Sequence, residues 1–181
     1  DVVIPNGVTS IGERAFSECD GLISVSIPDG VTSIGHYAFE KCSSLTSIEI
    51  PKGVTSIGFS AFERCSSLTN IEIPKGVTSI VGATFRECTS LTSLEVPEGV
   101  TSINDYAFSG CSSLTRIEIP KTVTSIATNA FDMCDKLTIY GEAGSYAETY
   151  AEENNIPFVC KPADEKEELI ITDISPVYPK K

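Results

Sequence analysis

Histidine, basic clusters and long apolar runs are scarce or missing in this sequence. The chain has one histidine, His36, and 13 basic against 25 acidic side chains, for a net charge of −12. Because Lys and Arg are not clustered, the sequence argues against nucleic-acid binding and against docking on anionic membranes. No apolar run approaches the ~20 residues of a membrane-spanning helix, and the chain does not open on a signal peptide. We expect one domain that is not inserted in a membrane.

Motifs for catalysis and metal binding are missing as well. There are 7 cysteines, but none is paired in the Cys-x-x-Cys spacing of zinc sites. The glycines fall at repeated turn positions and form no phosphate-binding loop. His36 lies at a variable position that should point outward, away from inward thiols such as Cys42, so a Cys–His pair is not expected. We expect no catalytic residue, no cofactor, no metal and no enzymatic activity.

The sequence does contain a strict internal repeat of 23 residues. Proline recurs at 5, 28, 51, 74, 97 and 120, and cysteine at 19, 42, 65, 88, 111 and 134. Such a period predicts a solenoid in which like side chains stack from one turn to the next. Stacked cysteines would point the same way, with a torsion unsuited to disulfides, so we expect a column of buried thiols. Cys160 lies outside the period, and we expect it to be buried in the end cap or else unpaired.

One period, read from Ile50, runs IPKGVTSIGFSAFERCSSLTNIEIP. Its Leu-x-x-Ile-x-Ile spacing resembles the strand of leucine-rich repeats, with both isoleucines inward and the residues between them outward. A second short strand is expected over 54–57, and Phe62 and Cys65, three residues apart, indicate a helical turn. We predict a right-handed, mostly β solenoid of the leucine-rich-repeat type. Its parallel sheet would have about six rungs and be roughly 30 Å long.

The repeats are expected to cover residues 1–137 and to be truncated at the N-terminus, because the chain opens inside a strand motif. Residues 138–160 should form a cap, in which Tyr140 replaces the branched aliphatic residue of its column. Ser145 and Glu148 have the spacing of a capping box, which predicts a helix from about Tyr146 to Glu153. A closing strand is expected over 156–159. Residues 161–181 are expected to be a linker or tail, and could begin a further domain.

Two outward faces are candidates for binding. The first is a strip of glutamates on the strand face with two flanking residues, namely Glu49, Glu72, Glu95, Glu118, Asn70 and Arg116. The strip suits a basic partner or Ca²⁺, but it could also result from repeat duplication and protection of the sheet edge, with Lys52, Lys75 and Lys121 as partial counter-ions. The second is an aromatic patch on the turns, which could be exposed as interfaces favour or could be half-buried packing. It comprises Tyr37, Phe59 and Tyr106.

The fixed order of IPxGVTSI, AFxxC and SSLTSI resembles the BspA-like leucine-rich repeat family over nearly all of residues 1–160. The ending LTIYGEAGSYAETYAEENNIPFV is similar to the terminal segment of bacterial members. The resemblance implies a secreted or surface-attached bacterial protein that binds host or cell-surface proteins, and it transfers no catalytic residue. We expect a monomeric adhesion module. The alternatives are a passive spacer and a substrate-targeting module of a larger surface protein.

Overall fold

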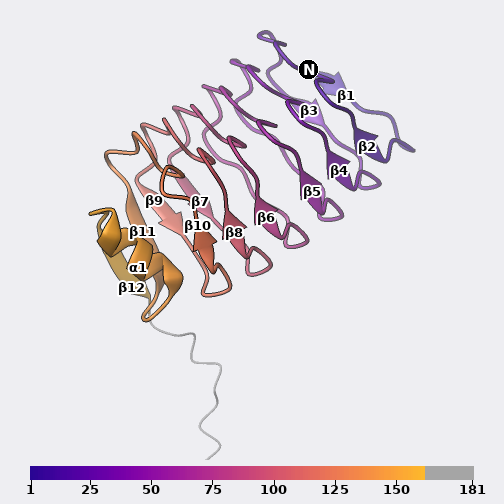
Figure 1. The fold of residues 1–181 in the computed structure, drawn as a ribbon. Helices are drawn as coiled ribbons and strands as arrows, with labels where there is room; N and C mark the ends of the chain where they lie inside the picture. The colour runs from indigo at the N-terminus through magenta and orange to yellow at the C-terminus, as the bar shows by residue number, and fades with distance from the viewer. Residues whose placement is uncertain (162–181) are drawn as a thin grey trace, which may run out of the picture.

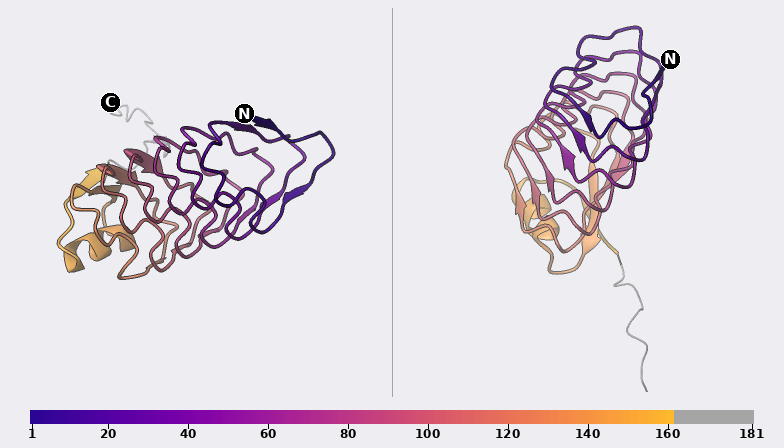
Figure 2. Two further views of the ribbon diagram at one scale, coloured as in Figure 1. Left: turned by 90° about the horizontal axis from the view of Figure 1, so that it is seen from above. Right: turned by 90° about the vertical axis from the view of Figure 1, so that its right-hand side faces the viewer.

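The computed structural model describes residues 1–161, and these residues form a solenoid whose coils stack along one axis (Figure 1). The described elements are β1 (Val2–Val3), β2 (Ser10–Ile11), β3 (Val25–Ser26), β4 (Ser33–Ile34), β5 (Ser56–Ile57), β6 (Ser79–Ile80), β7 (Ser93–Glu95), β8 (Ser102–Ile103), β9 (Arg116–Glu118), β10 (Ser125–Ile126), β11 (Thr138–Glu142), α1 (Tyr146–Glu153) and β12 (Phe158–Lys161). Viewed from the side and along its length, the chain advances coil by coil from the N-terminus to the cap (Figure 2). Of the predicted tail, residues 161–181, Lys161 is the last residue of β12, and residues 162–181 lie outside the described residues.

Both predicted strand columns are confirmed. The Leu-x-x-Ile-x-Ile segments pair in parallel as β1-β3 and as β12-β11-β9-β7, and a single bridge joins Ser47 to Asn70 between them. The shorter Val-Thr-Ser-Ile segments pair as β2-β4-β5 and as β10-β8-β6. Partners within the repeats are one period apart, as in Ile34 with Ile57, whereas the strands of the cap, β11 and β12, depart from the period. The chain is thus a parallel-strand solenoid of about seven turns, one more than expected.

A stack of phenylalanine rings forms the centre of the core. Neighbouring rings from Phe16 to Phe131 are nearly parallel, with centroids 5.2–5.7 Å apart. Phe39, Phe62, Phe85 and Phe108 are fully buried. Offset stacking of this kind adds to the free energy gained by burying each ring. Because each ring packs on the rings of adjacent coils, no coil could bury its own phenylalanine alone.

The expected helical turn around each phenylalanine is not a helix. Each such segment is instead a run of tight turns. In the first five coils two residues in the left-handed region bound it, such as Tyr37 (φ 56°) and Lys41 (φ 58°), and in the last coil only Met133 is left-handed. Alternate N–H groups donate to the next coil, as from Phe39 to the Ala61 carbonyl at 2.8 Å. The intervening N–H groups bond three residues back within the same turn. The turns therefore join neighbouring coils much as a strand ladder would.

The cysteine column consists of buried thiols that donate hydrogen bonds to backbone carbonyls. Each Sγ from Cys42 to Cys134 lies 3.1 Å from the carbonyl oxygen of the phenylalanine on the preceding coil, as in Cys65 to Phe39. These five thiols are buried, whereas Cys19 and Cys160 are exposed and free. The expected thiol column is confirmed. Of the two alternatives for Cys160, burial in the end cap is wrong, and the residue is an exposed free thiol. Cys160 pairs with Gly141 in the inward column, but β12 is the last strand of its sheet, so no further coil covers the thiol.

Thiol reactivity should separate these two classes. Burial raises the pKa of Cys42 and of Cys88 to about 12, so few thiolates form near pH 8. We expect Ellman's reagent to label two thiols rapidly in the native protein, and the other five only after unfolding. A Cys160→Ser variant should lower the rapid count by one. Rapid labelling of a third thiol in the native state would contradict this assignment.

The cap ends the stack with one helix. The N-cap Ser145 accepts a hydrogen bond from the Glu148 N–H, as the capping box predicts, and α1 has the expected bounds. The Tyr150 ring meets Phe131 edge-on at 5.9 Å and so ends the phenylalanine stack. The expected position of Tyr140 is wrong by one residue. Ile139 aligns with Ile117 and is buried, so Tyr140 aligns with Glu118 in the outward column.

Candidate binding surfaces

The acidic strip, defined as Glu49, Glu72, Glu95 and Glu118, lies on the outward face of the strand column. Alternation buries the aliphatic residues on either side of each glutamate, such as Ile48 and Ile50, and places the carboxylates on the outer face. Glu95 and Glu118 are direct neighbours across β7 and β9. Glu49, Glu72 and Glu95 are exposed and form no ion pair with any described residue. Three consecutive coils therefore present uncompensated carboxylates.

Glu118 differs from the other three members of the strip. It is half-buried and pairs with Arg116 at 3.0 Å and with Lys161 of β12. Burial raises the pKa of Glu118, but Lys161 and Arg116 outweigh this effect and lower it below the usual value. The lysines expected as counter-ions form no ion pair with the strip within residues 1–161, where Lys121 pairs with Glu142 instead. The C-terminal end of the strip is thus neutralised by the predicted flanking residue Arg116 and by Lys161, which the periodicity did not indicate.

The two predicted flanking residues are placed differently. Asn70 is exposed, and its backbone forms the bridge to Ser47. The Arg116 guanidinium lies 3.7 Å from the centre of the Tyr140 ring, a cation–π contact. Sequence reasoning missed this partner because it assigned Tyr140 to an inward position. The repeat is one residue shorter after Leu137 than in the earlier coils. Aligning Ile139, rather than Tyr140, with Ile117 would have placed Tyr140 on the outward face.

The aromatic patch is only partly assembled. Tyr37 and Phe59 meet edge-on at 5.5 Å, and the Arg14 guanidinium covers Tyr37 at 4.3 Å. Phe59 is 42% exposed, and its ring packs against Gly82, where a Cβ would lie 3.1 Å away. Tyr106 is 46% exposed and has its own guanidinium neighbour, Arg86, at 5.9 Å. The patch thus consists of one packed pair and one separate tyrosine.

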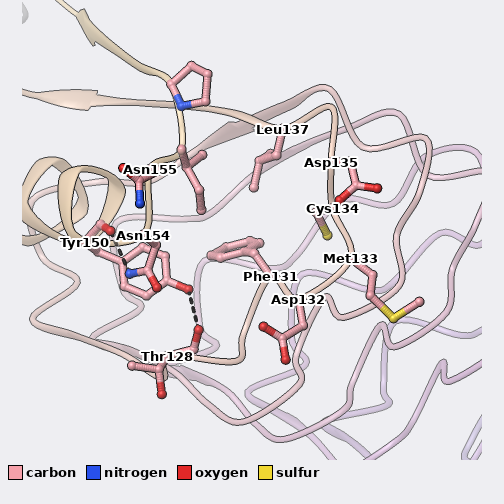
Figure 3. Close-up of a pocket in the computed structure, with 12 residues that line it drawn as sticks. Thr128, Phe131, Asp132, Met133, Cys134, Asp135, Leu137, Tyr150, Asn154 and Asn155 are labelled. Atoms are coloured by element: carbon pink, nitrogen blue, oxygen red, sulfur yellow. Dashed lines mark hydrogen bonds between the residues drawn. The ribbon is translucent and has the colours of Figure 1, made fainter.

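A pocket of about 290 Å³ lies between the last turn and the cap, and sequence reasoning missed it. Asp132, Met133 and Asp135 lie on one side, and Asn154 and Asn155 on the other (Figure 3). Phe131, Cys134, Leu137 and Tyr150 contribute to its wall.

The hydrogen bonds of the cap hold one side of this pocket in place. The Tyr150 hydroxyl donates to the Thr128 carbonyl at 3.2 Å, and Asn154 Nδ2 donates to the Tyr150 carbonyl at 2.8 Å (Figure 3). Burial raises the pKa of Tyr150 to about 12, so the hydroxyl keeps its proton and remains a donor near neutral pH.

A second pocket, of about 190 Å³, adjoins the acidic strip. Glu95, Glu98, Glu118, Glu142 and Lys161 line it together with buried apolar residues. Among residues 1–161 no group of three or more His, Cys, Asp or Glu side chains is placed to hold a metal ion. The strip therefore lacks the converging oxygen ligands that Ca²⁺ takes.

The structure does not bring the only histidine to a buried thiol. His36 is exposed, and its Nδ1 accepts a hydrogen bond from the Phe59 N–H at 2.9 Å. The nearest thiols in the column donate inward to carbonyls. A nucleophile–base pair would require both groups to face the same space, and they face different ones. No described helix is long and apolar enough to cross a bilayer.

Comparisons with known proteins agree with this architecture. A family model for BspA type leucine rich repeat regions matches residues 1–88 and 78–142, in 6 copies. A leucine-rich repeat protein of T. pallidum is 25% identical, with TM-score 0.66 over 89% of this chain and 86% of its own. One from Bacteroides ovatus is 28% identical, with TM-score 0.61 over 79% of this chain and 48% of its own. A leucine-rich cell surface protein of Faecalibacterium prausnitzii is 28% identical, with TM-score 0.52 over 83% and 61%. No curated protein sequence matches.

Proposed function

Because the chain belongs to the BspA-type leucine-rich repeat family, we propose that it is a non-catalytic protein-binding module of a bacterial surface or secreted protein. Solenoids of this kind present extended, rigid surfaces to partners. One similar structure is that of a cell surface protein, which supports this location. The chain spans 48% and 61% of two of the structures it resembles, so further domains could assist binding in the whole protein. The proposed role is adhesion to a host or cell-surface protein, with the chain acting as a monomer.

The observation that supports a binding role best is the uncompensated part of the acidic strip. Carboxylates on adjacent parallel strands repel one another by up to about 1 kcal/mol per pair in water. In the turns around the phenylalanines, by contrast, charged side chains form ion pairs between neighbouring coils, such as Arg64 with Glu87 at 2.8 Å. Glu49, Glu72 and Glu95 have no such pairs among the described residues. A partner that supplies positive charge would remove this repulsion on binding.

The spacing of the strip favours one shape of partner. Its carboxylates recur with the strand spacing of about 4.8 Å, so three span about 9.6 Å. Basic residues at i, i+4 and i+7 of a helix span about 10.5 Å, whereas alternate residues of an extended strand span about 13 Å. We therefore propose that the strip binds a basic helix, with Asn70 and Arg116 at its margin.

Charge reversal should test this proposal. We expect the triple variant Glu49→Lys, Glu72→Lys, Glu95→Lys to bind a helical peptide with three lysines at i, i+4 and i+7 about 100-fold more weakly. The measurement is calorimetry at low and at physiological salt, because screening should weaken the wild-type complex. The control variant Glu13→Lys, Glu152→Lys, Glu153→Lys changes the net charge equally but leaves the strip intact. Equal losses in the two variants, or no loss in either, would exclude the strip as the binding face.

The aromatic patch is the second proposed contact surface. Phe59 and Tyr106 are exposed aromatic residues, a type that is enriched at interfaces. Their substitution by serine in the same calorimetric experiment would show whether the turns that carry these two residues contribute to the affinity for the peptide.

A passive spacer is the alternative function. The uninterrupted stack of phenylalanines supports it, because a continuous core makes a stiff rod. A substrate-targeting module of a larger surface protein is a third possibility. If neither the basic helix nor a panel of host and cell-surface proteins binds the wild-type chain, the spacer is favoured.

A further inference from the structure

The cap covers only half of the last turn. Tyr150 packs on Phe131 and donates to the Thr128 carbonyl, so the first half of this turn is covered. The second half, from the Phe131 carbonyl to Asp135, faces the 290 Å³ pocket (Figure 3). The Met133 N–H has no acceptor among residues 1–161, and the Phe131 carbonyl accepts only the Cys134 N–H. Neither Asp132 nor Asp135 forms an ion pair with a described residue.

An inner turn shows what such groups bind. Phe62, Glu63 and Arg64 occupy the positions in their coil that Phe131, Asp132 and Met133 occupy three coils further on. The next coil meets them with three contacts from one short segment. The Arg86 carbonyl accepts from the Arg64 N–H at 2.7 Å, the Arg86 guanidinium pairs with Glu63 at 3.4 Å, and Cys88 Sγ donates to the Phe62 carbonyl at 3.1 Å.

The three groups of the inner turn that make these contacts all have equivalents among the groups of the open pocket. The Met133 N–H matches that of Arg64, the Asp132 carboxylate matches that of Glu63, and the Phe131 carbonyl matches that of Phe62. Met133 also has the left-handed backbone of Arg64, with φ 62° against 60°, so its N–H is set in the same local conformation. The pocket thus repeats, with free groups, a contact that the chain makes internally.

We propose that this pocket binds a polypeptide turn of a partner protein with the pattern Arg-x-Cys or Arg-x-Ser. The carbonyl of the arginine accepts from the Met133 N–H, its guanidinium pairs with Asp132, and the thiol or hydroxyl two residues later donates to the Phe131 carbonyl. Asp135 adds a second negative charge at the rim, which favours the same basic residue. This surface lies at the cap and is independent of the acidic strip.

The chain itself supplies the probe, a blocked peptide GATFRECT with the sequence of residues 82–89. We expect titration of the ¹⁵N-labelled protein, under reducing conditions, to shift the amide resonances of Met133 and its neighbours 132–135. Asp132→Arg should weaken binding at least tenfold, and a peptide with Glu in place of its Arg should bind this variant better than it binds wild type. The matched control Glu152→Arg changes a carboxylate of α1 that does not line the pocket, and it should bind the original peptide as wild type does.

Two results would overturn the proposal. One is the absence of peptide-induced shifts at residues 132–135, including the case in which shifts cluster on another face. The other is an equal loss of affinity in the Asp132 and Glu152 variants without rescue by the Glu peptide, which would indicate only unspecific attraction to an acidic protein.

Discussion

Replacing Phe62 by alanine is expected to lower the free energy of unfolding by about 3–5 kcal/mol. The ring is fully buried and stacks on Phe39 at 5.4 Å and on Phe85 at 5.7 Å. Alanine would leave a cavity in the middle of the stack, and both neighbouring rings would lose a contact face. Because stability in a solenoid depends on contacts between neighbouring coils, the cavity weakens two interfaces at once. Denaturant unfolding followed by circular dichroism would measure the change.

Phe16 is the matched control for this variant. It lies in the same column, but it is half-buried and stacks on one ring only, at 5.2 Å from Phe39. Phe16→Ala should therefore cost clearly less than Phe62→Ala. Equal costs at the two positions would mean that the stack does not stabilise the solenoid through its inner rings.

The period made the core predictable from sequence alone. Once Pro51, Phe62 and Cys65 were seen to recur every 23 residues, stacking assigned every inward column to the core. Burial of Leu68 and Ile71 beside them follows from the same argument. The reason is physical, because a parallel stack in register leaves each side chain only its own copies as neighbours along the axis.

The conformation of the turns could not be read from the period. Phe62 and Cys65 have the spacing of one helical turn, but Ser60 and Arg64 on either side adopt left-handed backbone with φ 54° and 60°. Neither residue type signals this conformation, which is usual for glycine or asparagine. Hydrogen bonds to the next coil stabilise it, as from Arg64 to the Arg86 carbonyl. A local pattern could not reveal a bond made 22 residues away.

The candidate surfaces were predictable only where the repeat is regular. Glu49, Glu72 and Glu95 point outward as alternation requires. Glu118 has the same place in the repeat, but its charge is balanced by Lys161, which belongs to the cap. The pocket at Asp132 was not predicted, because it depends on how far α1 covers the last turn. Periodicity predicts what each repeat shares, and these features arise where the repeats end.

One irregularity inside the repeats alters the sheet itself. Gly12, Gly35 and Gly58 follow the second strand of three coils, and the strands β2, β4 and β5 beside them pair without a gap. The next coil has Val81 at this position, and β5 does not pair with β6. Asn104 and Ala127 follow in later coils, where β6, β8 and β10 pair again. The interruption therefore coincides with the change from glycine to a residue with a Cβ.

The close approach of backbones at the glycines explains the interruption. A Cβ on Gly58 would lie 2.5 Å from the His36 nitrogen and 2.6 Å from the Gly35 carbonyl carbon. Gly35 is equally crowded, with Glu13 N at 2.7 Å. A side chain here cannot lie as close to a glycine coil, so we infer that Val81 prevents β6 from pairing with β5, while the adjoining turns stay bonded through Ser60 N and the Gly82 carbonyl at 3.1 Å.

Gly58→Ala should therefore move the interruption one coil toward the N-terminus. We expect a loss of about 1–3 kcal/mol in the free energy of unfolding, because the atoms that the new methyl would meet belong to the backbone and cannot rotate away. The hydrogen bonds from Gly58 N to the Ile34 carbonyl, 2.9 Å, and from Thr55 N to the Thr32 carbonyl, 3.0 Å, should weaken. Amide hydrogen exchange at residues 55 and 58 would then be faster than in wild type.

Gly53→Ala in the same coil separates crowding from the general effect of replacing a glycine. A Cβ at Gly53 would lie 3.4 Å from the Asp29 carbonyl oxygen, close to ordinary contact, and its backbone is not left-handed. This variant should match wild type or gain up to about 1 kcal/mol, because alanine has less conformational freedom in the unfolded chain. If Gly58→Ala were as stable as Gly53→Ala, with unchanged exchange at residues 55 and 58, crowding at the glycine column could not be the reason that β5 and β6 fail to pair.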